Sequence, residues 1–208
     1  MRGMADDLPL MEWLNKYIWP AEVRHVDSGF FLDGTRLACA EMLRGGITCF
    51  NDMYFFPDAS VQAVLTSGMR AAIGMIVIDF PTAYASDADD YLAKGLALRD
   101  RCRHHPLLSF CFAPHAPYTV SDKVFASVLT YAEQLDLPIH IHPHETDDEI
   151  RTSLKVNGMR PIERLHKPGM LGPKAIAATR DPLTTGEVAQ LAQQGVSVEP
   201  CGSPERTP

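Results

Sequence analysis

The sequence predicts an α/β fold organised around a parallel sheet. Short, nearly continuous apolar runs are typical of strands that are buried on both faces, and amphipathic helical patterns separate these runs. No low-complexity linker divides the alternating units, which favours a single domain. The pattern alone leaves a doubly wound sheet and a (β/α)8 barrel open, although no G-x-G-x-x-G sequence follows a strand.

Each expected element has local support in the sequence. Gly45-Gly46 and Gly68 suit helix ends, whereas Ser121 and Thr146 suit helix starts because their hydroxyls can accept hydrogen bonds from free backbone N–H groups. We therefore expect, in chain order, a helix around 37–43, a strand over 47–50, a helix over 58–67, a strand over 71–79, a helix over 87–103, a strand over 107–112, a helix over 121–134, a strand over 137–141, a helix from 146, a strand over 175–178, a helix from 184 or 185, and a strand over 196–198.

Composition excludes several classes of protein. The 208 residues are 46% hydrophobic and 22% charged, which is typical of a globular chain and not of a disordered one. The formal charge of −7 argues against a protein that coats nucleic acid, and no apolar run is long enough to cross a membrane. An odd count of cysteines without a C-x-x-C pair argues against a disulfide framework, and Met1–Asp7 has no apolar signal core, so a cytoplasmic location is expected.

The ends of the chain differ from an intact barrel. The sequence opens on an acidic stretch that is typical of a loop, and residues 201–208 carry no core-forming pattern. A complete (β/α)8 barrel usually takes ~250 residues, and only six strands are visible here. The sequence therefore argues against an intact eight-stranded barrel.

The densest chemical signal is a run of histidines at a strand end. His140, His142 and His144 alternate and are followed by Glu145, so a regular strand would place the three imidazoles on one face. Imidazole is a common ligand for zinc and iron, and a carboxylate beside a metal-bound water can carry its proton. A fortuitous histidine cluster at a polar strand edge is the alternative, and we favour metal or acid–base chemistry over it.

The second signal is the loop that follows residues 107–112. Two prolines stiffen the sequence A-P-H-A-P-Y, which carries His115 after a strand end, although for this loop taken alone we favour a tight turn with a structural histidine. Asp52 suits either a ligand or a cap of the next turn. We interpret His104-His105 as a structural helix end and assign nothing to the isolated His25 and His166.

Five motifs, taken in order, make the sequence recognisable: Gly3–Leu14, Trp19–Glu22, Gly45–Phe55, Ala113–Tyr118 and His142–Thr146. Together they resemble the amidohydrolase superfamily, in its TRZ/ATZ branch, and most closely the 5-methylthioadenosine/S-adenosylhomocysteine deaminases. The resemblance runs from residue 1 to about residue 178. It implies an incomplete TIM-type (β/α)8 barrel, roughly strands 2–7, without the flanking β-sandwich.

The resemblance also implies a reaction and a set of site residues. A divalent metal, usually zinc, would activate a water that displaces ammonia from an adenosine-type nucleoside such as 5-methylthioadenosine. By resemblance, His142 is a metal ligand, Glu145 is the catalytic proton shuttle, His115 contacts the substrate and steadies the intermediate, and Glu22 binds the ribose hydroxyls.

The same resemblance marks departures. Of the metal ligands that the family uses, the sequence retains His142 alone, and Thr179-Arg180-Asp181-Pro182 stands where another histidine is expected. Met75 stands near a position where some relatives carry an arginine for a substrate carboxylate, which favours an uncharged substrate. A catalytically inactive, truncated fragment is therefore the alternative function, with a chlorohydrolase or another aminohydrolase of the same branch as a further one.

The organisation expected from these departures is a partial barrel domain over 1–198 and an irregular tail over 199–208. Residues 179–183 and 199–208 lack some of the residues expected from the family and match others in part, so we hypothesise reading-frame damage there. Inspection of the nucleotide sequence tests this hypothesis. The expected partner is a small nucleoside, without nucleic acid or membrane, and a homo-oligomer stays open.

Overall fold

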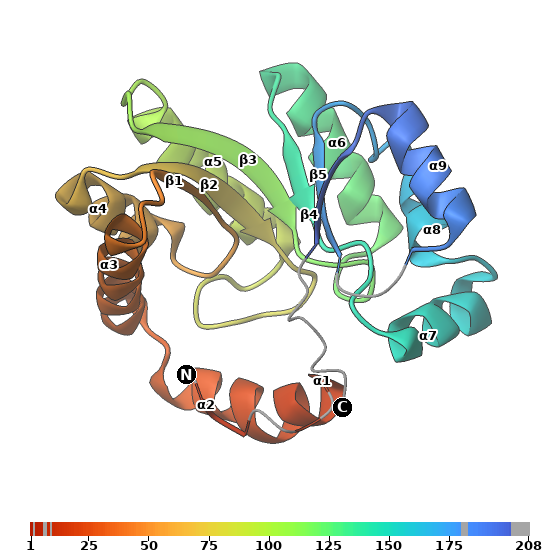
Figure 1. Cartoon of the computed structure of the whole chain (residues 1–208), viewed down its shortest axis with the longest axis horizontal. Helices are drawn as coiled ribbons and strands as arrows, with labels where there is room; N and C mark the ends of the chain where they lie inside the picture. Colours follow the sequence, from red (N-terminus) through yellow and green to blue (C-terminus); the bar gives the residue numbers. More distant parts are fainter. Residues whose placement is uncertain (2, 6–7, 9, 180–182, 201–208) are drawn as a thin grey trace.

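The computed structural model describes residues 1, 3–5, 8, 10–179 and 183–200. Six parallel strands form one curled sheet in which the strand order follows the chain order (Figure 1). The strands are β1 (Cys49–Asp52), β2 (Arg70–Val77), β3 (Leu108–Pro114), β4 (Ile139–Ile141), β5 (Ala175–Thr179) and β6 (Ser197–Pro200). This half-barrel confirms the predicted incomplete (β/α)8 fold.

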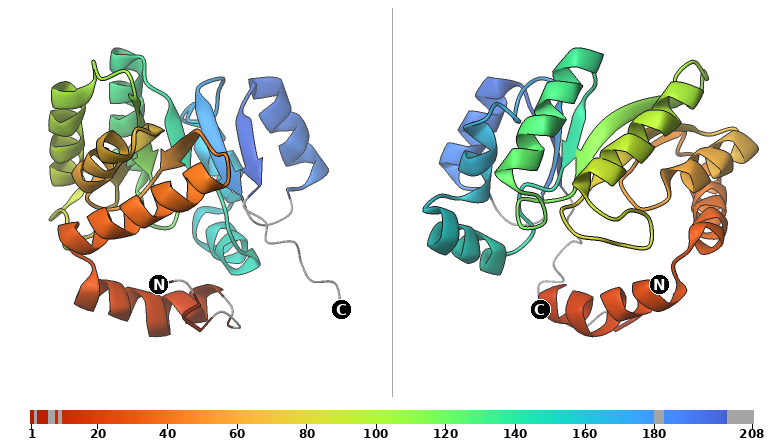
Figure 2. Two further views of the ribbon diagram at one scale, coloured as in Figure 1. Left: turned by 60° about the vertical axis from the view of Figure 1, so that its left-hand side comes forward. Right: turned by 180° about the vertical axis from the view of Figure 1, so that it is seen from behind.

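Helices connect successive strands, as right-handed parallel crossovers require. They are α4 (Pro57–Ser67), α5 (Ala88–Cys102), α6 (Asp122–Leu135), α7 (Asp147–Asn157), α8 (Pro161–His166) and α9 (Thr185–Gln194), and a further helix, α3 (Ser28–Arg44), precedes β1. Viewed from behind, α5 and α6 cover the outer face of the sheet (Figure 2). In the described part of the chain, no helix is long and apolar enough to cross a membrane.

Two helical parts lie where the sequence analysis assigned no element. An arm precedes the barrel and consists of α1 (Leu10–Trp13), the π-helical turn η1 (Leu14–Ile18) and α2 (Trp19–His25). The short α8 follows α7. In the arm, Ile18 is buried, and the indole of Trp13 donates to the carbonyl of Met4 at 2.6 Å. Tertiary contacts of this kind are invisible in a local pattern.

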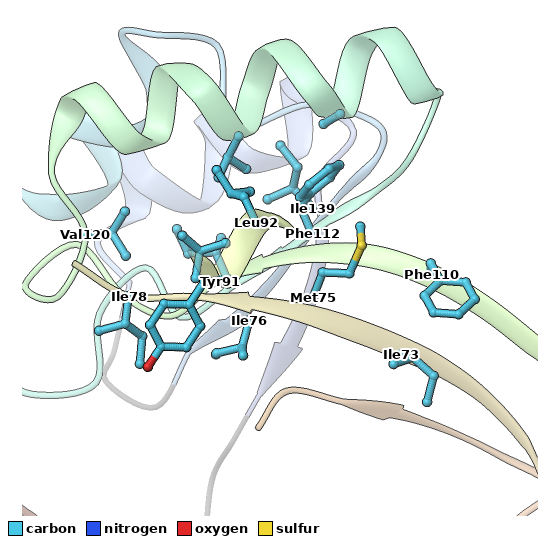
Figure 3. Packing of buried hydrophobic residues seen from close by; sticks show 14 of the residues in the cluster. Ile73, Met75, Ile76, Ile78, Tyr91, Leu92, Phe110, Phe112, Val120 and Ile139 are labelled. Carbon is cyan, nitrogen blue, oxygen red and sulfur yellow. The ribbon is translucent and has the colours of Figure 1, made fainter. Parts of the chain in front are cut away.

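The main core lies between the sheet and its outer helices. Ile73, Met75 and Phe112 are fully buried there (Figure 3). A Cβ added at Gly95 of α5 would lie 2.8 Å from the Cβ of Met75, so α5 approaches β2 closely at this point. Met75 therefore faces the helical layer and not the strand ends. Met75 therefore gives no support to the preference for an uncharged substrate, which stays a prediction.

The fourth strand is shorter than the sequence predicts. It covers Ile139–Ile141, and its register with β3 holds one pair, Phe112 with Ile139. Pro143 has no N–H to donate to a ladder, so the chain leaves the sheet before it reaches the proline. The expectation that three histidines share the face of one regular strand was therefore wrong, since His142 and His144 both follow the strand.

The expected frame-damaged segments are only partly visible. Strand β6 runs to Pro200, so residues 199 and 200 belong to the sheet, although the sequence analysis placed them in the tail. Thr179 ends β5. Residues 180–182 and 201–208 lie outside the described residues, and the hypothesis of frame damage stays a prediction there.

Candidate functional site

Backbone hydrogen bonds tie three strand ends together. The amide of His115 donates to the carbonyl of Val77 at 3.1 Å, and the amide of His142 donates to the carbonyl of His115 at 3.2 Å. The first bond joins the ends of β2 and β3, and the second joins the ends of β3 and β4. As a result the imidazole rings of His115 and His142 lie 5.9 Å apart between centroids. The structure thus brings together two of the predicted site residues.

His115 is held by its own loop. Its Nδ1 forms a 3.0 Å hydrogen bond with the hydroxyl of Thr119, and the ring of Tyr118 packs edge-on against it at 5.8 Å. Burial, reinforced by the neighbouring His142, lowers the pKa of His115 to about 4. The imidazole is therefore neutral at neutral pH, and it can form hydrogen bonds without carrying a charge.

Glu145 is positioned by the start of α7. The amide of Glu145 donates to the carboxylate of Glu149 at 2.8 Å, while the amide of Glu149 donates to the hydroxyl of Thr146 at 3.2 Å. The first bond holds the backbone at Glu145, and the second caps the start of α7 at its N-cap residue Thr146. The hydroxyl of Tyr118 donates to the Glu145 carboxylate at 3.4 Å. Tyr118 therefore contacts both His115 and Glu145, which places these two residues on one side of the sheet.

A buried polar row lies across the strands below His142. The amide nitrogen of Asn51 contacts Nδ1 of His140 at 2.9 Å, and the thiol of Cys111 donates to the amide oxygen of Asn51 at 3.7 Å. Burial and His142 lower the pKa of His140 to about 4, and burial and the charge of Asp52 raise the pKa of Cys111 to about 12. Both groups are therefore neutral and suit a structural, hydrogen-bonded row.

Asp52, for which a ligand role and a capping role were both considered, pairs instead with a side chain of the next helix. Asp52 accepts a 2.6 Å hydrogen bond from the hydroxyl of Ser60 in α4, and burial raises the pKa of Asp52 despite that bond. Alternate residues of a strand face opposite sides of the sheet, so Asn51 faces the side opposite to Asp52, where it contacts His140. Sequence reasoning missed Asn51 because neighbouring residues gave no signal for which side of β1 is inside.

Three histidines do not form a metal centre. His140 and His142 have ring centroids 5.6 Å apart, and Nε2 of His140 and Nδ1 of His142 are buried without a hydrogen-bond partner in the described residues. His144 is fully buried, and its carbonyl accepts from the hydroxyl of Thr179 at 3.3 Å. Among the described residues, no group of three or more His, Cys, Asp or Glu side chains could hold a metal ion.

Glu22 lies on α2, in the arm that runs along the carboxyl-end side of the sheet (Figure 1). Its carboxylate accepts a hydrogen bond from the hydroxyl of Tyr54, which follows β1 and stacks on Phe31 at 5.2 Å. Burial raises the pKa of Glu22. Glu22 is thus fixed at the β1 end of the site, whereas His115, His142 and Glu145 are grouped at the ends of β3 and β4.

The other histidines have contacts away from this group. Nδ1 of His105 accepts from the amide of Leu107 at 3.2 Å, which fits the structural interpretation of that segment. His166 contacts the side chain of Gln194 at the end of α9. Tyr118 and Thr119 are the site residues that the sequence analysis missed, and their only signal was their place in the A-P-H-A-P-Y-T loop.

Fold and site together define a class of protein. Titratable side chains gather at the carboxyl ends of parallel strands in a curled α/β sheet, which is where barrel enzymes carry their active sites. The chain belongs to the amidohydrolase family, since the profile described as "Amidohydrolase family" matches residues 1–207.

Curated relatives narrow the comparison. The chain is 47% identical over 200 residues to "5-methylthioadenosine/S-adenosylhomocysteine deaminase" of Saccharophagus degradans, covering 96% of this chain and 45% of the relative. It is 37% identical to "5'-deoxyadenosine deaminase" of Methanothermobacter thermautotrophicus, covering 95% of this chain and 46% of the relative. The chain therefore spans about half the length of the curated relatives that it matches.

Solved structures agree with the fold. An adenosine deaminase from Xanthomonas campestris with bound zinc superposes with a TM-score of 0.91 at 48% identity, over 95% of this chain and 45% of that one. An atrazine chlorohydrolase from Arthrobacter aurescens superposes with a TM-score of 0.80 at 19% identity, over 92% of this chain and 47% of that one. At that low identity the second likeness shows the fold alone.

The described residues do not fit the zinc that the similar deaminase holds. Catalytic zinc takes three protein ligands and a water, and His142 is the sole residue here that the resemblance assigns to the metal. No convergent group of three ligands exists in the described ranges. No chemical step is therefore derived through a metal.

Proposed function

We propose that this chain carries one part of the active site of an adenosine-type nucleoside deaminase. The observation that supports it is the grouping of His115, His142 and Glu145 at neighbouring strand ends, in a chain 47% identical to proteins named as such deaminases. The reaction would replace the amine of the base by the oxygen of water, with release of ammonia. The substrate would be 5-methylthioadenosine or a similar nucleoside.

Each residue has a proposed role in that reaction. Glu145 accepts a proton from the attacking water and returns it to the leaving amine, because a carboxylate can serve in both directions within one turnover. Neutral His115 forms a hydrogen bond with the substrate and its tetrahedral intermediate. Glu22, oriented by Tyr54, accepts hydrogen bonds from the ribose hydroxyls. His142 would be a metal ligand of the complete site.

We further propose that the 208 residues alone are inactive. The support is the poor fit to zinc, since the described residues offer no group of three convergent ligands. The similar activity named for the relatives belongs to chains about twice as long as this one. A chlorohydrolase function has no separate support, because the triazine hydrolases share the fold at low identity. A cytoplasmic location and a homo-oligomer stay predictions.

Metal content and deaminase activity test these proposals on the purified chain. Elemental analysis after dialysis against zinc is expected to find no stoichiometric metal, and ultraviolet assays with adenosine and 5-methylthioadenosine are expected to find no turnover. Stoichiometric zinc that is lost in the His142→Asn variant would contradict the proposal that the chain is inactive because it cannot hold the metal. Turnover that disappears in Glu145→Gln would establish the deaminase directly and contradict the inactive fragment.

Nucleoside binding tests the lineage separately from the chemistry. The chain is expected to bind 5-methylthioadenosine by calorimetry, with binding weakened in Glu22→Gln and His115→Asn. A matched control is Glu163→Gln, which changes an exposed carboxylate on α8 paired with Lys167. Equal binding by all variants, or no nucleoside binding at all, would argue against the proposed substrate class.

A further inference from the structure

A pocket of about 570 Å³ opens beside Glu145, outside the histidine group. Its walls come from the loop after β2 with Asp79 and Phe80, the loop over 117–121, α7 with Asp148 and Val156, and α8 with Arg164. A small molecule that reached Glu145 could extend into this pocket without displacing any helix. None of the proposed roles of His115, His142 or Glu22 uses it.

The pocket has an acidic lining. Four carboxylates line it, those of Asp79, Glu145, Asp148 and Glu149. Asp148 forms a 2.6 Å ion pair with Arg151, whose side chain is 67% exposed. A surface pair of this kind is weak and is screened by solvent and salt, so it leaves much of the negative field in place.

The cation that lines the pocket, Arg164, is already engaged. Its guanidinium donates to the carbonyls of Pro117 and Val120 and lies 2.7 Å from the carboxylate of Asp122. Its side chain is 13% exposed, and it packs over the ring of Phe125 at 5.6 Å. An anionic ligand would therefore have to break this arrangement before it could pair with Arg164.

Aromatic and apolar side chains complete the walls. Phe80 is 46% exposed, Tyr118 is 39% exposed, and Val156 is 72% exposed, so all three offer surface to a ligand. Burial and the charges of Glu145 and Glu149 raise the pKa of Tyr118, which is a second sign that the field here is negative. Aromatic faces attract cations in addition to burying apolar groups.

We propose that this pocket binds an organic cation, an ammonium group carried on a small apolar body, beside Glu145. Charge complementarity selects the cation, and the exposed aromatic walls select the apolar body. The proposal deepens the proposed function and rests on it in one respect, since the ligand would be a nucleoside whose substituent carries a positive charge in preference to a carboxylate or phosphate. The pocket itself can be probed without a nucleoside.

Three matched probes test the pocket on the 208-residue chain. Phenethylamine, 2-phenylethanol and phenylacetate share the aromatic body and carry a positive, neutral and negative group. We expect calorimetry to show phenethylamine binding about fivefold or more tightly than the alcohol, with the weakest binding by phenylacetate, because opposite charges in a partly buried site attract. The advantage of the amine should shrink as salt is raised, whereas binding of the alcohol should not change.

The variants Asp79→Asn and Asp33→Asn remove one negative charge each. Asn at 79 can still accept the 2.8 Å hydrogen bond from the amide of Ser121, so the loop is kept, and Asp33 lies on α3, away from the pocket. Asp79→Asn should reduce the advantage of the amine at least about twofold, and Asp33→Asn should leave it unchanged. Equal binding of amine and alcohol, no binding of either, or equal effects of both variants would overturn the proposal.

A nucleoside arm separates this proposal from the proposed function. 5′-Amino-5′-deoxyadenosine is compared with adenosine. If phenethylamine binds through the pocket but neither nucleoside binds, the pocket proposal holds and the nucleoside function fails. If both nucleosides bind with equal affinity, the pocket proposal fails while the nucleoside function stands.

Discussion

The seam between β2 and β3 and the seam between β3 and β4 share a strand but are built differently. The first has seven paired positions in register, from Ala71 with Leu108 to Val77 with Pro114. The second has one, Phe112 with Ile139. Outside that pair, the second seam has backbone bonds from Phe112 to Pro138 at 2.9 Å and from His142 to His115 at 3.2 Å.

The difference shows how the sheet makes room for a site. Side chains from β1 and α8 contact the elements beside this seam: Asn51 of β1 contacts His140 of β4, and Arg164 of α8 contacts the loop after β3. His115 and His142 stand at this thin seam, where backbone freed from the ladder can turn side chains towards a ligand. The long seam is a continuous ladder, whereas the short seam carries two residues of the proposed site.

The largest expected effect comes from Phe112→Ala at the thin seam. Phe112 is fully buried and stacks with Tyr131 at 6.3 Å, so its truncation should cost about 3–5 kcal/mol of unfolding free energy. Few ladder bonds hold this seam, so the variant should expose more surface while still folded. The slope of the unfolding free energy against urea concentration should therefore also fall. Ile73→Ala, in the long seam, is the control, and it should lower stability with no change in the urea slope. Equal slopes in both variants would contradict the proposed difference between the two seams.

Gly74→Ala tests how closely β2, one strand of the long seam, packs against its two neighbours β1 and β3. A Cβ at Gly74 would lie 2.3 Å from the carbonyl oxygen of Asp52 and 2.9 Å from the Cβ of Ala113. Forcing β1 and β2 apart should cost about 1–3 kcal/mol in a thermal melt. The matched control is Gly172→Ala, where nothing lies within 4 Å of an added Cβ. A similar melting temperature for both variants would mean that β2 can shift relative to its neighbours at little cost in stability.

Acid should destabilise the fold through the thin seam. His115 and His140 have pKa values of about 4 when folded, against 6.5 ordinarily. Between these values the unfolded chain binds more protons, so stability is complete above about pH 6.5 and decreases as pH falls towards 4. Urea unfolding across that range checks the slope. His140→Asn should reduce the slope of stability against pH, whereas a substitution of the exposed His104 should not. The reverse result would show that the slope does not arise from His140.

The smallest effect expected is a difference in amide exchange. The amides of His115 and His142 both lie just past a strand, and each donates to a carbonyl of the neighbouring strand end. Because the bond from His142 crosses the thin seam, its amide should exchange about tenfold faster, equivalent to about 1.4 kcal/mol. Hydrogen exchange followed by NMR measures both rates in one sample. Slower exchange at His142 would show that the thin seam is the more stable one.

The sequence predicts the strands well and the facing of side chains less well. Apolar runs such as 71–79 are local signals, so they place β2 and its neighbours nearly where they lie. Which of Asn51 and Asp52 faces inward depends on α4 and β4, far along the chain. The same holds for Met75, whose partner is Gly95, and for the helical arm with Ile18. Packing between distant parts of the chain determines which way these side chains face, and the local sequence carries no information about that packing.

Arg164 has a consequence for the order in which the chain folds. It holds the loop that carries His115 and Tyr118, and its partner Pro117 lies 47 residues earlier in the sequence. During synthesis that loop leaves the ribosome well before α8 does. Contacts between distant residues form late because they close long loops. We therefore expect the surroundings of His115 to order only after α8 has docked, later than the strands β2 and β3 that they follow.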